Sequence, residues 1–267
     1  LYALMVSQTA LGKVTFLGDF ESGDLKGWGL ESPGDDRCRI VTEPVRSGKY
    51  AVRFECTKDQ KDVANSKRCE IVQMNSGGPN NANRDCWFGW SLYIPKDWES
   101  DPQSPENVTQ WHELPDTEIG ETWRSPPLAL AVKGEQFNFH VRWDSRAKTP
   151  GNNPEGTENL PAGGIERGQW TDWVLHIRWS FEKDDGLIEV WKNGQKIITR
   201  KGPNGYNDRR ETYFKAGVYK WEWKSNPRNS ITSRRVIYVD EVRFGDKDAS
   251  YEEVAPRPAN NGALQSK

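Results

Sequence analysis

The sequence has few of the residues that mark several large classes of protein. Methionine occurs 2 times, histidine 3 times and cysteine 4 times in 267 residues. No run approaches the roughly 20 consecutive apolar residues that a membrane-spanning helix requires. The net charge of −2 gives no excess of positive charge for binding nucleic acid. We therefore expect neither a membrane protein nor a nucleic-acid-binding protein.

The cysteines lack the spacing of a metal site. Cys38, Cys56, Cys69 and Cys86 include no CxxC pair and have no neighbouring histidine, which argues against zinc. Two glycine-containing turns would place Cys38 opposite Cys56 and Cys69 opposite Cys86, although four cysteines allow three pairings. Two disulfides would imply an oxidising compartment. The sequon Asn107-Val108-Thr109 also fits a secreted protein, extracellular or periplasmic.

Tryptophan, glycine and proline are abundant. The chain has 13 Trp, 24 Gly and 16 Pro. Tryptophan offers a flat amphipathic surface on which sugar rings stack. This composition favours an extracellular β-protein that handles carbohydrate.

Short alternating segments separated by turn residues run through the whole sequence. Their spacing predicts an all-β protein, a two-sheet sandwich or jelly roll. Asn193-Gly194 is a strong hairpin signal between two such segments. The stretches Pro95–Asn107 and Asp144–Gly168 are predicted to be long loops that wall a groove. The predicted strands are Lys13–Phe20, Arg37–Thr42, Tyr50–Cys56, Arg68–Met74, Trp87–Ile94, Leu128–Lys133, Gln136–Trp143, Trp173–Trp179, Leu187–Lys192, Gln195–Arg200, Tyr213–Trp223 and Arg235–Phe244.

We expect one domain over residues 13–250. Residues 1–12 are interpreted as an N-terminal remnant or extension, and residues 251–267 as a C-terminal tail. The protein is expected to be a monomer.

Three segments carry residues suited to chemistry. In Arg68-Cys69-Glu70-Ile71, Arg68 and Glu70 share one face of a strand, and the plain alternative is a surface ion pair. In Gln110-Trp111-His112, the amide and the imidazole share a face, although a lone strand histidine is more often structural. In Tyr213–Tyr219, Lys215 and Tyr219 share a face with Gly217, which leaves the backbone open to a close-lying ligand. The plain alternative is an aromatic core strand.

The three segments occur in the order of the motifs of jelly-roll polysaccharide lyases. Residues 213–219, YFKAGVY, resemble an alginate lyase motif. The overall plan, from Asp19-Phe20-Glu21-Ser22-Gly23 to Tyr238-Val239-Asp240-Glu241, is similar to the heparin lyase and glucuronan lyase branch. The resemblance implies a β-jelly roll, a concanavalin-like two-sheet sandwich, with a concave substrate groove. Lys220-Trp221 stands where alginate lyases have Asn-Gln, which departs from alginate specificity.

The residues fit β-elimination on a uronic-acid polymer. The enzyme must neutralise the uronate carboxylate, remove the C5 proton and protonate the C4 oxygen as it leaves. Arg68 and Gln110 suit the neutralising role, Tyr219 suits the acid, and His112 suits the base or a further neutralising group. In gluco- and manno-configured uronates Tyr219 alone could be both base and acid. The expected product carries an unsaturated uronate end.

Substrate contacts and a structural ion are also predicted. Glu21 and Asp240 lie where jelly-roll carbohydrate proteins often hold Ca²⁺, with backbone carbonyls of residues 47–49 completing the shell. Two solvated carboxylates are the alternative. No organic cofactor is expected. The predicted substrate-binding residues are Lys215, Arg142, Glu70, Lys220 and Trp221.

The leading hypothesis is a secreted polysaccharide lyase that acts on an anionic polysaccharide. The low net charge ranks glucuronan-type polymers first, alginate next and heparin-type chains last. A non-catalytic carbohydrate-binding jelly-roll module is the main alternative. A glycoside hydrolase using carboxylates among Glu113, Asp116, Glu118 and Glu121 ranks below it, because this segment lacks strict alternation.

Overall fold

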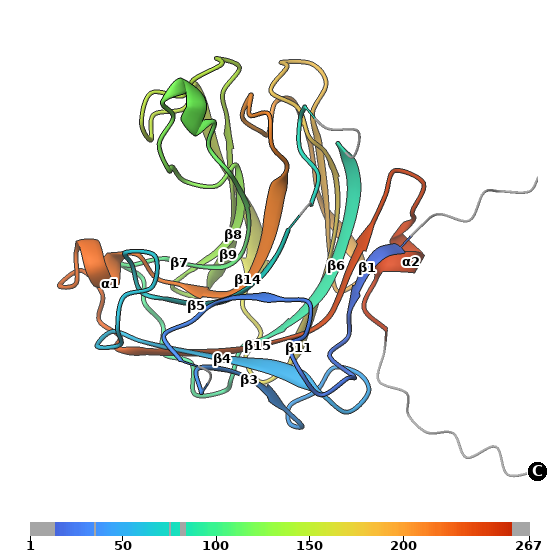
Figure 1. Ribbon diagram of the computed structural model, residues 1–267. Coiled ribbons are helices and arrows are strands. Elements are labelled where there is room, and N and C mark those ends of the chain that lie inside the picture. Colours follow the sequence, from blue (N-terminus) through green and yellow to red (C-terminus); the bar gives the residue numbers. More distant parts are fainter. Residues whose placement is uncertain (1–13, 35, 75, 81–83, 258–267) are drawn as a thin grey trace, which may run out of the picture.

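The computed structural model describes residues 14–257, apart from residues 35, 75 and 81–83. The described residues form two antiparallel sheets and three short helical turns. The turns are η1 (Thr117–Ile119), α1 (Glu222–Ser225) and α2 (Tyr251–Val254). Figure 1 shows the sheets as two layers, with β5, β7 and β14 over β4 and β15. This architecture confirms the predicted all-β jelly roll, whereas the extension over residues 1–12 lies outside the described residues.

The outer sheet has strand order β13-β12-β11-β6-β15-β4-β3, and β1 pairs with β15. Its strands are β1 (Val14–Gly18), β3 (Cys38–Val41), β4 (Ala51–Thr57), β6 (Asp85–Tyr93), β11 (Trp170–Arg178), β12 (Leu187–Lys192), β13 (Gln195–Lys201) and β15 (Arg234–Gly245).

The inner sheet has strand order β10-β9-β8-β7-β14-β5-β2 and carries the groove described below. Its strands are β2 (Gly29–Glu31), β5 (Arg68–Gln73), β7 (Glu106–Glu113), β8 (Leu128–Lys133), β9 (Gln136–Trp143), β10 (Gly156–Gly164) and β14 (Thr212–Tyr219). β14 therefore lies between two of the predicted motif segments, β7 and β5.

Tryptophan builds the core between the sheets. Trp90, Trp111 and Trp173 are fully buried, and the Trp90 and Trp173 rings stack 6.2 Å apart. Alternate side chains of facing strands fill the space between two packed sheets, and large aromatic rings bury the most apolar area there. The interpretation of tryptophan as sugar-stacking surface is therefore wrong for these residues. Trp123, 61 % exposed, differs from them.

Most of the predicted strands agree with the structure. β2 and β7 lie outside the predicted strands, and the predicted strand Tyr213–Trp223 ends at Tyr219, before α1. The Asn193-Gly194 hairpin is confirmed, with φ of 50° and 82° as a tight turn requires. β10 falls within a stretch predicted to be a loop. It is an edge strand that contains Pro161 and is mostly exposed, so it has no alternating apolar pattern.

The predicted disulfides are wrong. All four cysteines are among the described residues, and each is a buried thiol outside any disulfide. Cys38 pairs across the hairpin with Phe54 and not with Cys56. Cys69 and Cys86 lie on strands of different sheets. The compartment inferred from disulfides loses this support.

The last turn of chain packs on the outer sheet. In α2, Val254 is fully buried, and its carbonyl oxygen lies 1.8 Å from the place that a Cβ at Gly89 would take. The predicted tail therefore starts with ordered structure at Tyr251. Within the described residues, no helix has the length and apolarity needed to cross a membrane.

Candidate active site

A groove of about 960 Å³ lies along the inner sheet. Its lining combines strand residues with residues of the loops at 64–66, 123–126 and 221–225. The predicted residues Arg68, His112, Arg142, Tyr219 and Trp221 all line it. The strands also contribute Glu31, Asn107, His140 and Tyr213.

An ion cluster lies in the floor of the groove. Lys215 is fully buried, and its Nζ lies 2.8 Å from Glu31 Oε2 and 2.7 Å from Glu70 Oε2. Arg68 Nη1 lies 2.8 Å from the same Glu31 oxygen and 3.5 Å from Glu70 Oε2. Two cations and two carboxylates leave this cluster without net charge. Lys215 and Glu70 thus support the floor from below and do not face substrate as predicted.

An amide relay extends from this cluster into the groove. Gln110, also fully buried, donates from Nε2 to Glu70 Oε1 at 2.5 Å. Because the carboxylate accepts this hydrogen bond, Gln110 must turn its Oε1 the other way, where it accepts from Asn107 Nδ2 at 3.3 Å. Gln110 therefore acts through Asn107, which lines the groove.

Arg68, Tyr219 and Asn107 form one row across three strands. Tyr219 on β14 is the register partner of Arg68 on β5 and of Asn107 on β7. The Arg68 guanidinium carbon lies 4.2 Å from the centre of the Tyr219 ring. Arg68 Nε and Asn107 Oδ1 are both buried without a hydrogen-bond partner among the described residues. Unpaired buried polar atoms are costly, which marks this row as a place for a polar ligand.

His112 is held as a neutral imidazole. Its Nδ1 contacts the backbone N and O of Glu113 at 2.9 and 3.0 Å, and its ring stacks on Tyr213 with centroids 5.4 Å apart. Burial lowers the pKa of His112 to about 4. With Nδ1 occupied by its own backbone, Nε2 is the nitrogen available to a ligand.

Lys220, predicted to bind substrate, does not line the groove. Its side chain is fully buried, and Nζ donates to the Ser104 carbonyl oxygen at 2.6 Å. It also pairs with Glu106 and, at 3.1 Å, with Asp101. Lys220 directly follows Tyr219, the last residue of β14, and alternation from Tyr219 already turns it away from the groove.

Asn107 is the residue that the sequence analysis missed as a functional candidate. It is only 5 % exposed in the folded chain, so it is not an accessible glycosylation site. The pairing of β7 shifts between Asn107 and Thr109, and a β-bulge of this kind turns Asn107 to the face of Gln110 and His112. Strict alternation puts residue 107 on the opposite face. Because most residues of β7 are polar, a polar residue at position 107 gives no signal in the sequence.

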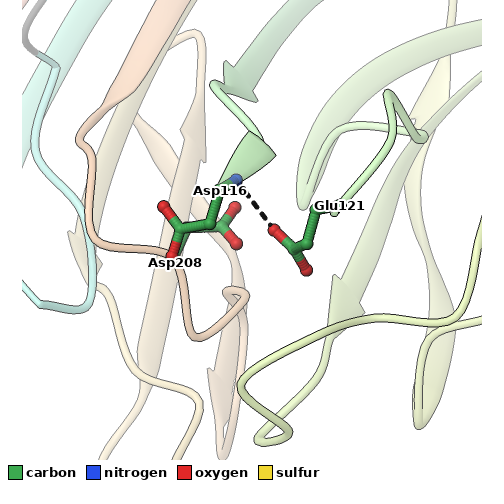
Figure 2. Close-up of side chains that lie close together, drawn as sticks. All are labelled: Asp116, Glu121 and Asp208. Carbon is green, nitrogen blue, oxygen red and sulfur yellow. Dashed lines mark hydrogen bonds between the residues drawn. The ribbon is translucent and has the colours of Figure 1, made fainter. Parts of the chain in front are cut away.

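Buried carboxylates hold one wall of the groove. Figure 2 shows Asp116, Glu121 and Asp208 close together, with Glu121 accepting the backbone N–H of Asp116. Their carboxylate oxygens lie within 4.8 Å of one another, as metal ligands do. Arg124 is already among them and donates to both oxygens of Asp208. These acids tie the segment after β7 to residue 208, and they are not aimed into the groove as a hydrolase pair.

The predicted calcium ligands, Glu21 and Asp240, accept hydrogen bonds from the backbone of the loop at residues 46–50. Glu21 accepts the backbone N–H groups of Lys49 and Tyr50 at 2.9 and 3.0 Å. Asp240, fully buried, accepts those of Arg46 and Ser47 at 2.8 and 3.3 Å. The predicted ion shell required backbone carbonyls from this loop, whereas the loop presents N–H donors. These residues do not fit that shell.

The comparisons with known proteins agree with this fold. An endo-β-1,4-glucuronan lyase from the fungus Trichoderma reesei superposes with a TM-score of 0.75 at 20 % identity, over 92 % of this chain and 100 % of its own. A family 7 alginate lyase, A1-II′, superposes with a TM-score of 0.58 at 15 % identity, over 86 % and 99 % of the two chains. An alginate lyase from Chlorella virus gives 0.56 at 13 %, over 88 % and 100 %.

These structures share the fold of this chain. Among curated proteins, none matches the sequence. The family model described as polysaccharide lyase matches residues 20–243, most of the chain. The protein belongs to the polysaccharide lyase family and is a polysaccharide lyase with a jelly-roll fold.

Proposed function

We propose that the protein cleaves a polyuronide by β-elimination, with glucuronan-type polymers as the first candidate, alginate the second and heparin-type chains the last. The row of Arg68, Tyr219 and Asn107 carries this proposal. It places a guanidinium N–H, a phenol and an amide oxygen together, and two of these groups lack a hydrogen-bond partner among the described residues.

The row supplies the first requirement of the reaction. The C5 proton of a uronate is weakly acidic because the adjacent carboxylate resists a second negative charge. Arg68 Nε donates a hydrogen bond to that carboxylate, and Asn107 Oδ1 accepts one from a hydroxyl of the same sugar. Donors fixed before the reaction starts stabilise developing charge without reorganisation. Gln110 is a positioning residue, because it orients Asn107.

Tyr219 and His112 then move the protons. Tyr219 protonates the C4 oxygen as it leaves, and its phenolate takes the C5 proton where both groups leave from the same side. For the C5 epimers the two groups leave from opposite sides. Neutral His112, with its proton on Nδ1 and donated to the Glu113 carbonyl oxygen, then accepts the C5 proton through Nε2. The reaction balances within the substrate: one C–H and one C–O bond break, and a C4–C5 double bond forms.

Charge supports the order of substrates. The floor cluster has no net charge, because Glu31 and Glu70 offset Arg68 and Lys215. Densely sulfated chains need a denser set of unpaired cations than this groove offers. The similarity of the fold to a glucuronan lyase supports glucuronan first. A polymeric substrate of this kind is met outside the cell, so we also propose that the enzyme is secreted.

The test is the absorbance of the unsaturated uronate product on a panel of glucuronan, alginate, heparin-type and pectic polymers. We expect a rise on glucuronan and the loss of at least about 100-fold of that activity in Tyr219→Phe, with an unchanged melting temperature. Binding to a polymer without any rise in absorbance would instead indicate a carbohydrate-binding module. Full activity of Tyr219→Phe would contradict the assigned acid.

A further inference from the structure

One cation in the groove has no counter-ion. Arg68 pairs with Glu31, Arg124 with Asp208, and Lys224 with Asp62 at 2.5 Å. Within the described part of the chain, Arg142 has no carboxylate at ion-pair distance, and its Nη1 donates to the carbonyl oxygen of Pro126 at 2.9 Å.

Arg142 is also partly buried. Burial lowers the pKa of the Arg142 guanidinium, as expected when a cation is desolvated without an acid beside it. The nearby Glu113 does not serve as its partner, because Glu113 lies 3.4 Å from Arg124 and burial raises the pKa of its carboxyl. A charge kept in this condition is costly unless a ligand of opposite sign completes it.

The strand register places Arg142 near the reaction centre, at a distance that suits the neighbouring sugar. Trp111 on β7, Leu128 on β8 and Val141 on β9 are register partners. One residue further along, the backbone N–H of Arg142 donates to the carbonyl oxygen of Pro127. Arg142 therefore lies in the row of His112, two strands away, at a backbone separation of about 10 Å. His140 lines the groove two residues earlier on β9, and burial lowers its pKa to about 4, so it adds a neutral hydrogen-bonding group.

We propose that Arg142 forms an anion subsite that binds the carboxylate of a uronate neighbouring the one cleaved. This inference rests on the proposed polyuronide substrate. It names the residue that binds the carboxylate of the neighbouring uronate. Because the floor cluster is neutral, Arg142 supplies the unpaired positive charge that the described residues place in the groove. The subsite selects chains of consecutive uronates over chains in which charged and neutral sugars alternate.

The test compares Arg142→Gln with Lys224→Gln, a matched variant that removes a groove cation already paired with an acid. On glucuronan we expect Arg142→Gln to raise KM roughly 10- to 100-fold with kcat within about threefold. Lys224→Gln should change KM less than about threefold. An Arg142→Gln enzyme with wild-type KM, or equal losses in the two variants, would overturn the subsite.

A second measurement separates the subsite from the proposed reaction. Titration calorimetry of glucuronan oligosaccharides with Tyr219→Phe, with and without Arg142→Gln, measures binding without turnover. We expect the added substitution to weaken binding to the free-acid oligosaccharide and to leave binding of its methyl ester unchanged. Equal weakening for both ligands would overturn the proposal. If the wild type cleaves no polyuronide but this difference in binding remains, the proposed reaction fails and the subsite stands.

Thermal unfolding of the free protein shows whether the variant is still folded. Removing a desolvated, unpaired charge should leave the melting temperature of Arg142→Gln unchanged or raised. If this variant does not fold, Arg142→Lys tests the same point, because it keeps the charge and loses the planar fork of donors. An Arg142→Lys enzyme that binds the oligosaccharide as tightly as wild type would overturn recognition by the guanidinium.

Discussion

At the scale of residues, Asn107 and Gln110 work as one unit. The hydrogen bond from Gln110 to Glu70 fixes the Gln110 amide, and that amide in turn orients Asn107. Because Gln110 has no exposed atoms, it reaches substrate only through its neighbour.

This coupling predicts non-additive kinetics. Asn107→Ala and Gln110→Ala should each lower kcat/KM by roughly 10- to 100-fold, since each leaves buried polar groups unpaired. The double variant should lose little more than Asn107→Ala alone. Steady-state kinetics of the four proteins give the comparison. Losses that multiply in the double variant would show that Gln110 contacts substrate independently.

We expect His112 to set the acid limb of the pH profile. Because burial lowers its pKa to about 4, the imidazole is neutral over the ordinary pH range and gains a proton only below about pH 4. If neutral His112 is the base, kcat/KM should fall tenfold per pH unit below that point and not below about pH 6.5. The profile on a C5-epimeric substrate, measured against His112→Asn, checks this. Activity that rises at acid pH would assign His112 as a cationic neutralising group instead.

At the scale of elements, the close packing of β14 on β5 requires glycine at position 217. Its φ is 135°, and a Cβ there would lie 2.2 Å from the Cys69 carbonyl oxygen and 2.7 Å from the Glu70 Cα. The predicted role, open backbone for a close ligand, is therefore wrong: the close neighbour is strand β5.

Substitution at Gly217 should be felt as lost stability. We expect Gly217→Ala to reduce the free energy of unfolding by about 2–4 kcal/mol, from backbone strain and overlap with β5. Gly151→Ala is the matched control, because Gly151 also has positive φ, 58°, but nothing lies within 4 Å of its added Cβ. Chemical denaturation of both variants isolates the overlap. Equal losses would mean that the close approach costs nothing.

Most of the strands were predictable, but their partners were not. Alternation marks a strand such as β9, whose inward residues are Phe137, Phe139 and Val141. It says nothing about which sheet a strand joins. β5 and β6 follow one another yet belong to different sheets, so a local hairpin argument misplaced Cys69 and Cys86.

The candidate site was predictable in outline for the same reason. Arg68, His112 and Tyr219 reach the groove by simple alternation. Asn107 depends on a bulge, and the burial of Lys220 depends on acids far along the chain, Asp101 and Glu106. Neither of these depends on the local pattern of residues.

At the scale of the whole molecule, buried histidines and buried aspartates change the stability in opposite directions as pH changes. Burial lowers the pKa of His112 and His140 to about 4, so each costs stability as pH falls from about 6.5 towards 4. Burial raises the pKa of Asp208 and Asp240 to about 7, so each costs stability as pH rises from about 3.8 towards 7. The two contributions oppose one another over the same interval.

Two acids with a lowered pKa make the folded chain less stable at lower pH. Despite burial, hydrogen bonds and nearby cations lower the pKa of Glu55 and of Asp101 to about 2, so their stabilisation is present above about pH 4.5 and lost as pH falls towards 2. We expect a melting temperature that changes little between about pH 5 and 6.5 and drops steeply below about pH 4. Calorimetry across pH tests this, and Asp101→Asn should make the acid drop shallower. A steady decline from neutral pH would contradict the balance.

The buried Asn107 also bears on the choice of production host. Glycosyl transfer acts on sequons in chains that have not yet folded, and a glycan on Asn107 would occupy the floor of the groove. Thr109→Val removes the sequon and keeps Asn107, and it replaces a buried hydroxyl that has no hydrogen-bond partner among the described residues. In a eukaryotic secretory host, this variant should give more active enzyme per milligram than the unaltered sequence, whereas bacterial preparations of the two should be equally active.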